Sequence, residues 1–151
     1  MIWHIFKKDW KLIWRLAMGV ALVHFALATV LFKIGHFGNR TLEQLVDPLI
    51  MIAMVGTGFL IAAIVHLDAV PGVRQDWLVR PVRRRDLLLA KLLFLLVMVH
   101  GPILAADLTQ ALGDGFSISE SLISAIWRCL YIFVGFSLPL MALASLTRNF
   151  M

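Results

Sequence analysis

Two histidines lie where ionisable chemistry inside a membrane would need them. His24 is midway along the apolar stretch 16–32, and His100 is midway along 87–106, beside Gly101-Pro102. An ionisable group at membrane depth can carry protons or bind a metal ion. No carboxylate falls mid-stretch to assist them, and zinc sites use three or four protein ligands. We favour neutral histidines that bond neighbouring helices over a proton relay or a metal site.

Motifs for covalent or nucleotide chemistry are missing from the sequence. There is no Gly-x-x-x-x-Gly-Lys-Ser/Thr loop, so the chain itself does not bind ATP in that way. Ser117, Ser119, Ser121 and Ser124 have no basic partner in place and are expected to be turn and cap residues. Cys129 is the only cysteine, which excludes an internal disulfide. We therefore expect no enzyme activity, no cofactor and no metal.

Four long apolar stretches must position these groups: residues 16–32, 48–67, 87–106 and 122–146. A hydrocarbon core about 30 Å thick needs ~20 apolar helical residues to cross it, and only a helix satisfies its own backbone there. The chain is 61% hydrophobic and 15% charged, far from the ~25% charged residues of a soluble domain. The sequence predicts an all-α, polytopic bundle of four membrane helices that forms a single domain over 1–151.

The first fourteen residues combine aromatic and basic side chains at helical spacing. This pattern is typical of an amphipathic helix in the membrane interface, with tryptophan at headgroup level. The expected interface residues are Trp3, Lys7, Lys8, Trp10, Lys11 and Trp14. The alternative is a cytoplasmic extension of the first membrane helix.

Lysine and arginine are unevenly distributed among the loops. They are dense before the first span and in segment 68–86, whereas 107–120 has none. The positive-inside rule places the N-terminus, segment 68–86 and the C-terminus in the cytoplasm, on an inner (plasma) membrane protein. Because the basic residues flank apolar stretches, the net charge of +5 indicates lipid contact rather than nucleic acid. Arg128 and Lys91 are expected to snorkel toward headgroups.

Segment 68–91 has an ordered pattern of residue types. Pro71-Gly72 predicts a turn. A short amphipathic helix with Trp77 and Arg80 should follow and end before Pro81, since the residue before a proline avoids helical angles. Asp86 stands where a carboxylate favours the start of the next helix.

This pattern resembles the first cytoplasmic loop of the permease subunits of type-2 ABC exporters. In that family an acidic residue and a glycine precede a short helix, a proline, arginines, an acidic residue, a leucine run and a lysine. The matching residues are Asp68, Gly72, Leu78, Pro81, Arg84, Asp86, the leucines 87–89 and Lys91. The chain departs from the pattern at Val70, Pro71 and Val73. Such permeases generally have six spans, so we expect a short or truncated member.

The resemblance implies a membrane-spanning permease subunit, or the N-terminal part of one, of an ABC-type transporter that works as an exporter. A separate ATPase subunit would dock on loop 72–86, and a second permease copy would complete a homo- or heterodimer. The implied docking residues are Arg74, Asp76, Trp77, Arg80, Arg83 and Arg84. Two alternatives stay open. The arginines could serve only topology and anionic lipid, or the chain could be a small non-transport scaffold or immunity-like subunit of another membrane protein.

Overall fold

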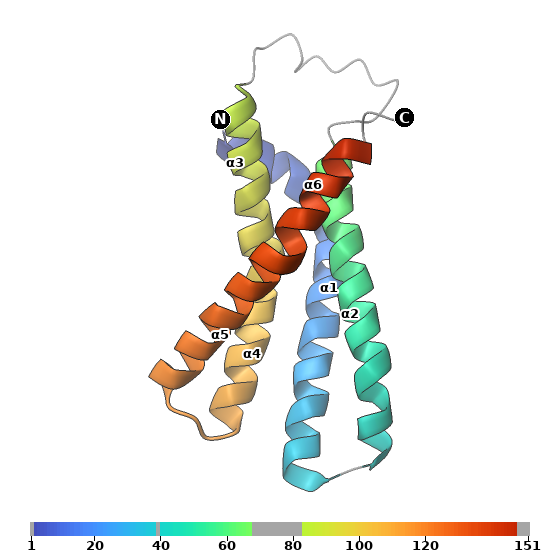
Figure 1. The fold of residues 1–151 in the computed structure, drawn as a ribbon, viewed down its shortest axis with the longest axis vertical. Helices are drawn as coiled ribbons and strands as arrows, with labels where there is room; N and C mark the ends of the chain where they lie inside the picture. The colour runs from blue at the N-terminus through green and yellow to red at the C-terminus, as the bar shows by residue number, and fades with distance from the viewer. Residues whose placement is uncertain (1, 39, 68–82, 148–151) are drawn as a thin grey trace.

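The computed structural model describes residues 2–38, 40–67 and 83–147, and over these ranges the chain is helical with no strand (Figure 1). The elements in chain order are α1 (Ile2–Phe37), α2 (Arg40–His66), α3 (Arg84–Phe94), the π-helical η3 (Leu95–His100), α4 (Gly101–Gly113), α5 (Ile118–Ile132), the π-helical η4 (Phe133–Ser137) and α6 (Leu138–Thr147). The predicted all-α class is confirmed.

Within the described residues, four continuous helical runs are long and apolar enough to cross a membrane. They are Ile2–Phe37, Arg40–His66, Arg85–Gly113 and Ile118–Thr147. At about 1.5 Å per residue, the shortest run of 27 residues extends for about 40 Å, which exceeds the ~30 Å of a hydrocarbon core. Each run contains one predicted span, so four membrane helices are confirmed for a polytopic membrane protein.

The first helix combines both predicted arrangements of the N-terminus. α1 is one continuous helix, but its first part runs across the long axis of the bundle while the rest runs along it (Figure 1). Phe6, Asp9 and Ile13 are buried on one face, whereas Lys7 and Lys11 on the other are exposed. This is the geometry that an amphipathic helix needs at a membrane surface.

α1 is the central helix of the bundle. It contacts α2, α3, η3 and α4, while α2 contacts α6, and α4 contacts α5. We call the end where α1 and α3 begin the charged end, and the end with the connections 37–40 and 113–118 the turn end. The most buried apolar side chains lie toward the charged end: Leu60, Ile61, Ile64, Phe94 and Leu95. Many other apolar side chains are exposed, as expected for helices that face lipid.

Pro102 and Pro139 each come just after a π-helical turn in their helical run. A proline lacks the N–H for the bond to the carbonyl four residues earlier, and its ring clashes with that carbonyl. Those carbonyls belong to Met98 and Gly135, and both residues lie inside the π-helical turns η3 and η4. A wider turn relieves the conflict, and such turns are frequent at functional sites.

Gly113 allows α4 to approach α1 at the turn end. A Cβ there would lie 2.7 Å from Phe32 Cε2, too close for the ring to stay in place. We therefore expect Gly113→Ala to lower the free energy of unfolding by about 1 kcal/mol through overpacking. Gly19→Ala, with open space around its Cβ, should instead stabilise the helix. Thermal unfolding in detergent measures both, and equal shifts in the two variants would contradict the packing argument.

Candidate functional site

The most deeply buried charges among the described residues form an ion pair at the charged end. Lys91 Nζ on α3 donates to Asp9 Oδ2 on α1 at 2.8 Å. Asp9 is fully buried and Lys91 is only 5% exposed. Lys8 Nζ lies 3.6 Å from the other oxygen, Asp9 Oδ1. The pair ties the crossing part of α1 to the first turns of α3.

An aromatic contact supports this pair from the next turn of both helices. Phe6 is three residues before Asp9, and Phe94 is three residues after Lys91, so each lies on the same helix face as its charged neighbour. The two rings are 5.3 Å apart between centroids. Both rings are buried, and an apolar environment around an ion pair strengthens the attraction between its charges.

Sequence reasoning missed Asp9 and was wrong about Lys91. The expectation was that Lys91 would extend toward headgroups, but its amine is buried against a carboxylate. The signal was present in the sequence. Asp9 lies on the face marked by Phe6 and Ile13, and a carboxylate on an apolar face requires a cation to offset its desolvation.

Most of the predicted docking residues fall outside the described ranges: Arg74, Asp76, Trp77 and Arg80 lie in 68–82. Arg83 is exposed and directly precedes α3, and Arg84 is its first residue. The connection between α2 and α3 therefore leads directly into the helix that carries Lys91.

The predicted interface residues divide into two groups. Trp3, Lys7, Lys11 and Trp14 are exposed, whereas Lys8 and Trp10 are partly buried. The Lys7 amine lies 5.6 Å from the centre of the Trp3 ring, and Trp3 stacks on Phe6 with centroids 5.1 Å apart. The exposed group combines aromatic rings and amines, the chemistry that headgroups attract.

The two membrane histidines have different partners. His100 Nε2 lies 3.1 Å from Ser137 Oγ, and both residues are buried. This contact joins η3 to η4, as expected for a histidine that bonds a neighbouring helix. His24 instead donates from Nδ1 to the Val20 carbonyl of its own helix at 2.9 Å. Among the described residues, no group of three histidine, cysteine or acidic side chains could hold a metal ion.

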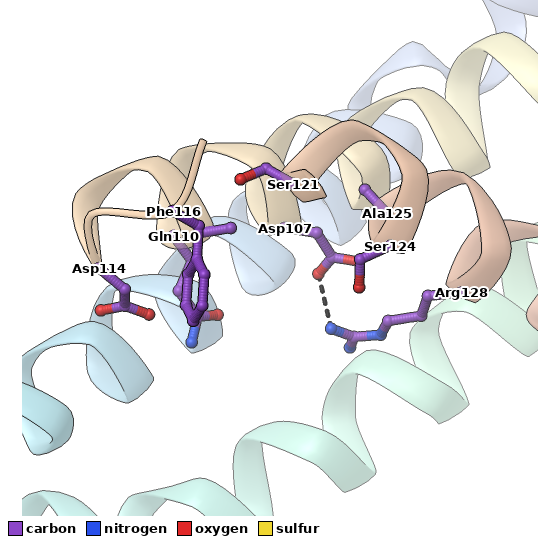
Figure 2. A pocket seen from close by; sticks show the side chains of 9 residues that line it. Asp107, Gln110, Asp114, Phe116, Ser121, Ser124, Ala125 and Arg128 are labelled. Atoms are coloured by element: carbon purple, nitrogen blue, oxygen red, sulfur yellow. Dashed lines mark hydrogen bonds and ion pairs between the residues drawn. The ribbon is translucent and has the colours of Figure 1, made fainter. Parts of the chain in front are cut away.

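A polar pocket lies between α4 and α5 near the turn end (Figure 2). Arg128 Nη1 donates to Asp107 Oδ1 at 2.7 Å, so Arg128 has a carboxylate partner where the sequence predicted only snorkelling. The pocket has a volume of about 180 Å³, and Gln110, Phe116 and Ser121 also line it. Asp107 Oδ2 and Ser121 Oγ are buried and have no hydrogen-bond partner.

The serines near this pocket have different roles. Ser117 caps α5, since its Oγ accepts from the Glu120 N–H at 3.4 Å and donates to the Glu120 carboxylate at 2.6 Å. Ser117 is therefore the cap residue that the sequence predicts, although the Glu120 carboxylate accepts from the Ser117 hydroxyl and not from its backbone N–H, as it would in a capping box. Ser121 is buried inside α5, so the expectation of a turn or cap residue is wrong for it.

No known protein family, curated protein or solved structure matches this chain. Its class is therefore defined by its own geometry. It is a membrane helical bundle with a buried ion pair at one end, a histidine–serine contact between two π-helical turns, and a polar pocket at the other end.

Removing one partner of the ion pair should destabilise the protein strongly. Lys91→Met leaves the Asp9 carboxylate buried without its closest cation, a change that typically costs about 3–5 kcal/mol. The double variant Asp9→Leu with Lys91→Met removes both charges and should recover most of that loss. Thermal unfolding in detergent measures the three proteins. If the double variant is no more stable than Lys91→Met, the two charges do not act as a pair.

Proposed function

We propose that this chain is the membrane-spanning permease subunit, or the N-terminal part of one, of an ABC-type transporter that works as an exporter. A separate ATPase subunit would dock on the loop 72–86. A second permease copy would complete the substrate path between the two bundles, and lipids would cover the remaining apolar faces. In this proposal the chain itself catalyses no reaction. The loop pattern from Gly72 to Lys91 is the sequence support for it.

The gathering of helix ends at the charged end supports a docking platform. α1 and α3 begin there, and α2 and α6 end there (Figure 1). The exposed side chains of Lys7, Lys11, Arg83 and Arg85 make this end basic. The positive-inside rule expects the basic end to be the cytoplasmic one. ATP is available to an ATPase subunit on that side of the membrane.

The ion pair between Asp9 and Lys91 is the observation that carries the proposal. Lys91 follows the proposed docking loop by about one and a half helical turns, and it is bound to the central helix α1. A force applied to the loop would act on the start of α3. The ion pair would transmit this force to α1, which contacts α2, α3, η3 and α4. A loop that only connected two helices would not require a buried ion pair between α3 and α1.

Loss of the docking residues should release the ATPase. We expect Trp77→Ala with Arg80→Ala to reduce the amount of ATPase that co-purifies with this chain by at least about tenfold, because tryptophan and arginine dominate interface energies. A nucleotide photolabel on the co-purified subunit, in material from the native membrane, measures the retained ATPase.

A matched control also removes one aromatic ring and one arginine, but at the opposite end of the bundle. Phe37→Ala with Arg40→Ala changes one exposed aromatic ring and one exposed arginine near the turn end and should retain the ATPase. Equal retention in both double variants would overturn the docking assignment. A stable complex with another membrane protein, indifferent to nucleotide and without an ATPase, would favour the scaffold alternative.

The proposal also requires the charged end to face the cytoplasm. In a Cys129→Ser background, Arg83→Cys should react with a membrane-impermeant maleimide only after spheroplasts are permeabilised. Ser119→Cys, exposed near the turn end, should react in intact spheroplasts. The reverse pattern would place the loop outside the cell and exclude an ATPase partner.

A further inference from the structure

We propose that the pocket between α4 and α5 binds a protonated primary amine. The site lies near the turn end, away from the docking loop at the charged end. It therefore does not depend on the proposed ATPase partner, and either assignment can fail without the other.

Two buried acceptor atoms indicate that the pocket holds a ligand. Ser121 is only 3% exposed, and neither its Oγ nor Asp107 Oδ2 has a hydrogen-bond partner. Figure 2 shows the Ser121 hydroxyl turned to the side of Gln110 and Phe116. An unpaired buried polar atom costs free energy unless a water or a ligand satisfies it. A small molecule that donates hydrogen bonds inside the pocket would recover this cost.

The charges around the pocket select a cation. Asp107 and Asp114 contribute two carboxylates, and Arg128 contributes one guanidinium that is bound to Asp107. The nearest ring nitrogen to Asp114 is His36 Nδ1 at 3.7 Å, which is long for a hydrogen bond. With histidine neutral, the pocket has one negative charge in excess. This negative charge would repel an anion and attract a cation.

A primary ammonium group matches the chemistry of the lining better than a cation without N–H groups. It presents three N–H donors, and the lining offers oxygen acceptors on Asp107, Ser121 and Gln110. The Phe116 ring lies beside the same space (Figure 2) and can contact a cation through its face. A quaternary ammonium has no N–H and would leave both buried oxygens unsatisfied.

The size and depth of the pocket limit where the amine comes from. A volume of about 180 Å³ accommodates a group of several heavy atoms and is below the range of ~300–1,000 Å³ for drug-sized ligands. Asp107 is six residues before the end of α4, about 9 Å along the helix. Both a small soluble amine and the headgroup of an ethanolamine phospholipid could reach it.

Ethanolamine and choline together test the chemistry. The purified full-length chain is titrated with each in detergent, and the midpoint of thermal unfolding is followed. A ligand that binds only the folded state raises this midpoint. We expect ethanolamine to raise it and choline, with equal charge but no N–H, to leave it unchanged.

A second arm separates the two sources. The chain is placed in nanodiscs of phosphatidylethanolamine or of phosphatidylcholine, with and without free ethanolamine. Protection by ethanolamine in detergent and in phosphatidylcholine indicates a soluble amine. Protection by phosphatidylethanolamine alone, with free ethanolamine ineffective, indicates the lipid headgroup.

Ser121→Ala distinguishes a ligand-binding hydroxyl from a structural one. It removes an unpaired buried hydroxyl, so the unliganded protein should keep its stability, while affinity for the protecting amine falls about tenfold. Ser145→Ala, which removes a hydroxyl bonded within α6, should retain wild-type affinity.

Asp107→Asn tests the carboxylate and should weaken binding of the amine by at least about tenfold. Asp47→Asn on α2 is the control, because it changes the charge equally and should leave binding unchanged. Ser121→Ala keeps the test valid if Asp107→Asn does not fold. The proposal is wrong if neither ethanolamine nor phosphatidylethanolamine protects the wild type. It is equally wrong if choline protects as well as ethanolamine, or if Ser121→Ala binds the amine as tightly as the wild type.

Discussion

The ion pair between Asp9 and Lys91 buries two opposite charges against each other, so a movement of α1 or α3 alone would separate them. Separating them would leave a carboxylate or an ammonium in a medium of low dielectric constant, which is far more costly than losing an exposed pair. Because Phe6 and Phe94 pack one turn away, a shift of either helix would also open the aromatic contact. The ion pair and the aromatic contact therefore couple the start of α3 to the crossing part of α1.

Three polar contacts between helices lie at successive depths along the bundle. Asp9 and Lys91 join α1 to α3 near the charged end, His100 and Ser137 join the two π-helical turns, and Asp107 and Arg128 join α4 to α5 toward the turn end. Apolar faces can slide past one another at little cost in lipid, since lipid is as apolar as they are. Contacts of this kind therefore fix the register of the helices, which apolar packing alone leaves loosely specified.

The sequence predicted the helices well and their polar contacts poorly, for a physical reason. A membrane span is dictated locally, because lipid requires about twenty apolar helical residues in a row, and Leu60 or Ile61 contribute to that signal wherever they face. A polar contact depends on which two faces meet. Asp9 and Lys91 are 82 residues apart, and nothing local links them. The same holds for Arg128, whose partner became evident only when α4 and α5 were placed side by side.

The two ends of the bundle differ in how many cations surround their buried carboxylate. At the charged end, Lys91 donates to Asp9 Oδ2, and Lys8 lies 3.6 Å from Asp9 Oδ1, which has no hydrogen-bond partner. At the pocket, Asp107 has Arg128 on one oxygen, and its other oxygen and the Ser121 hydroxyl lack hydrogen-bond partners. Two amines around one carboxylate resist the separation of α1 from α3, because moving either helix would pull opposite charges apart. At the pocket, the cost of the unpaired atoms is recovered only when a donor enters, which favours the capture of a ligand there.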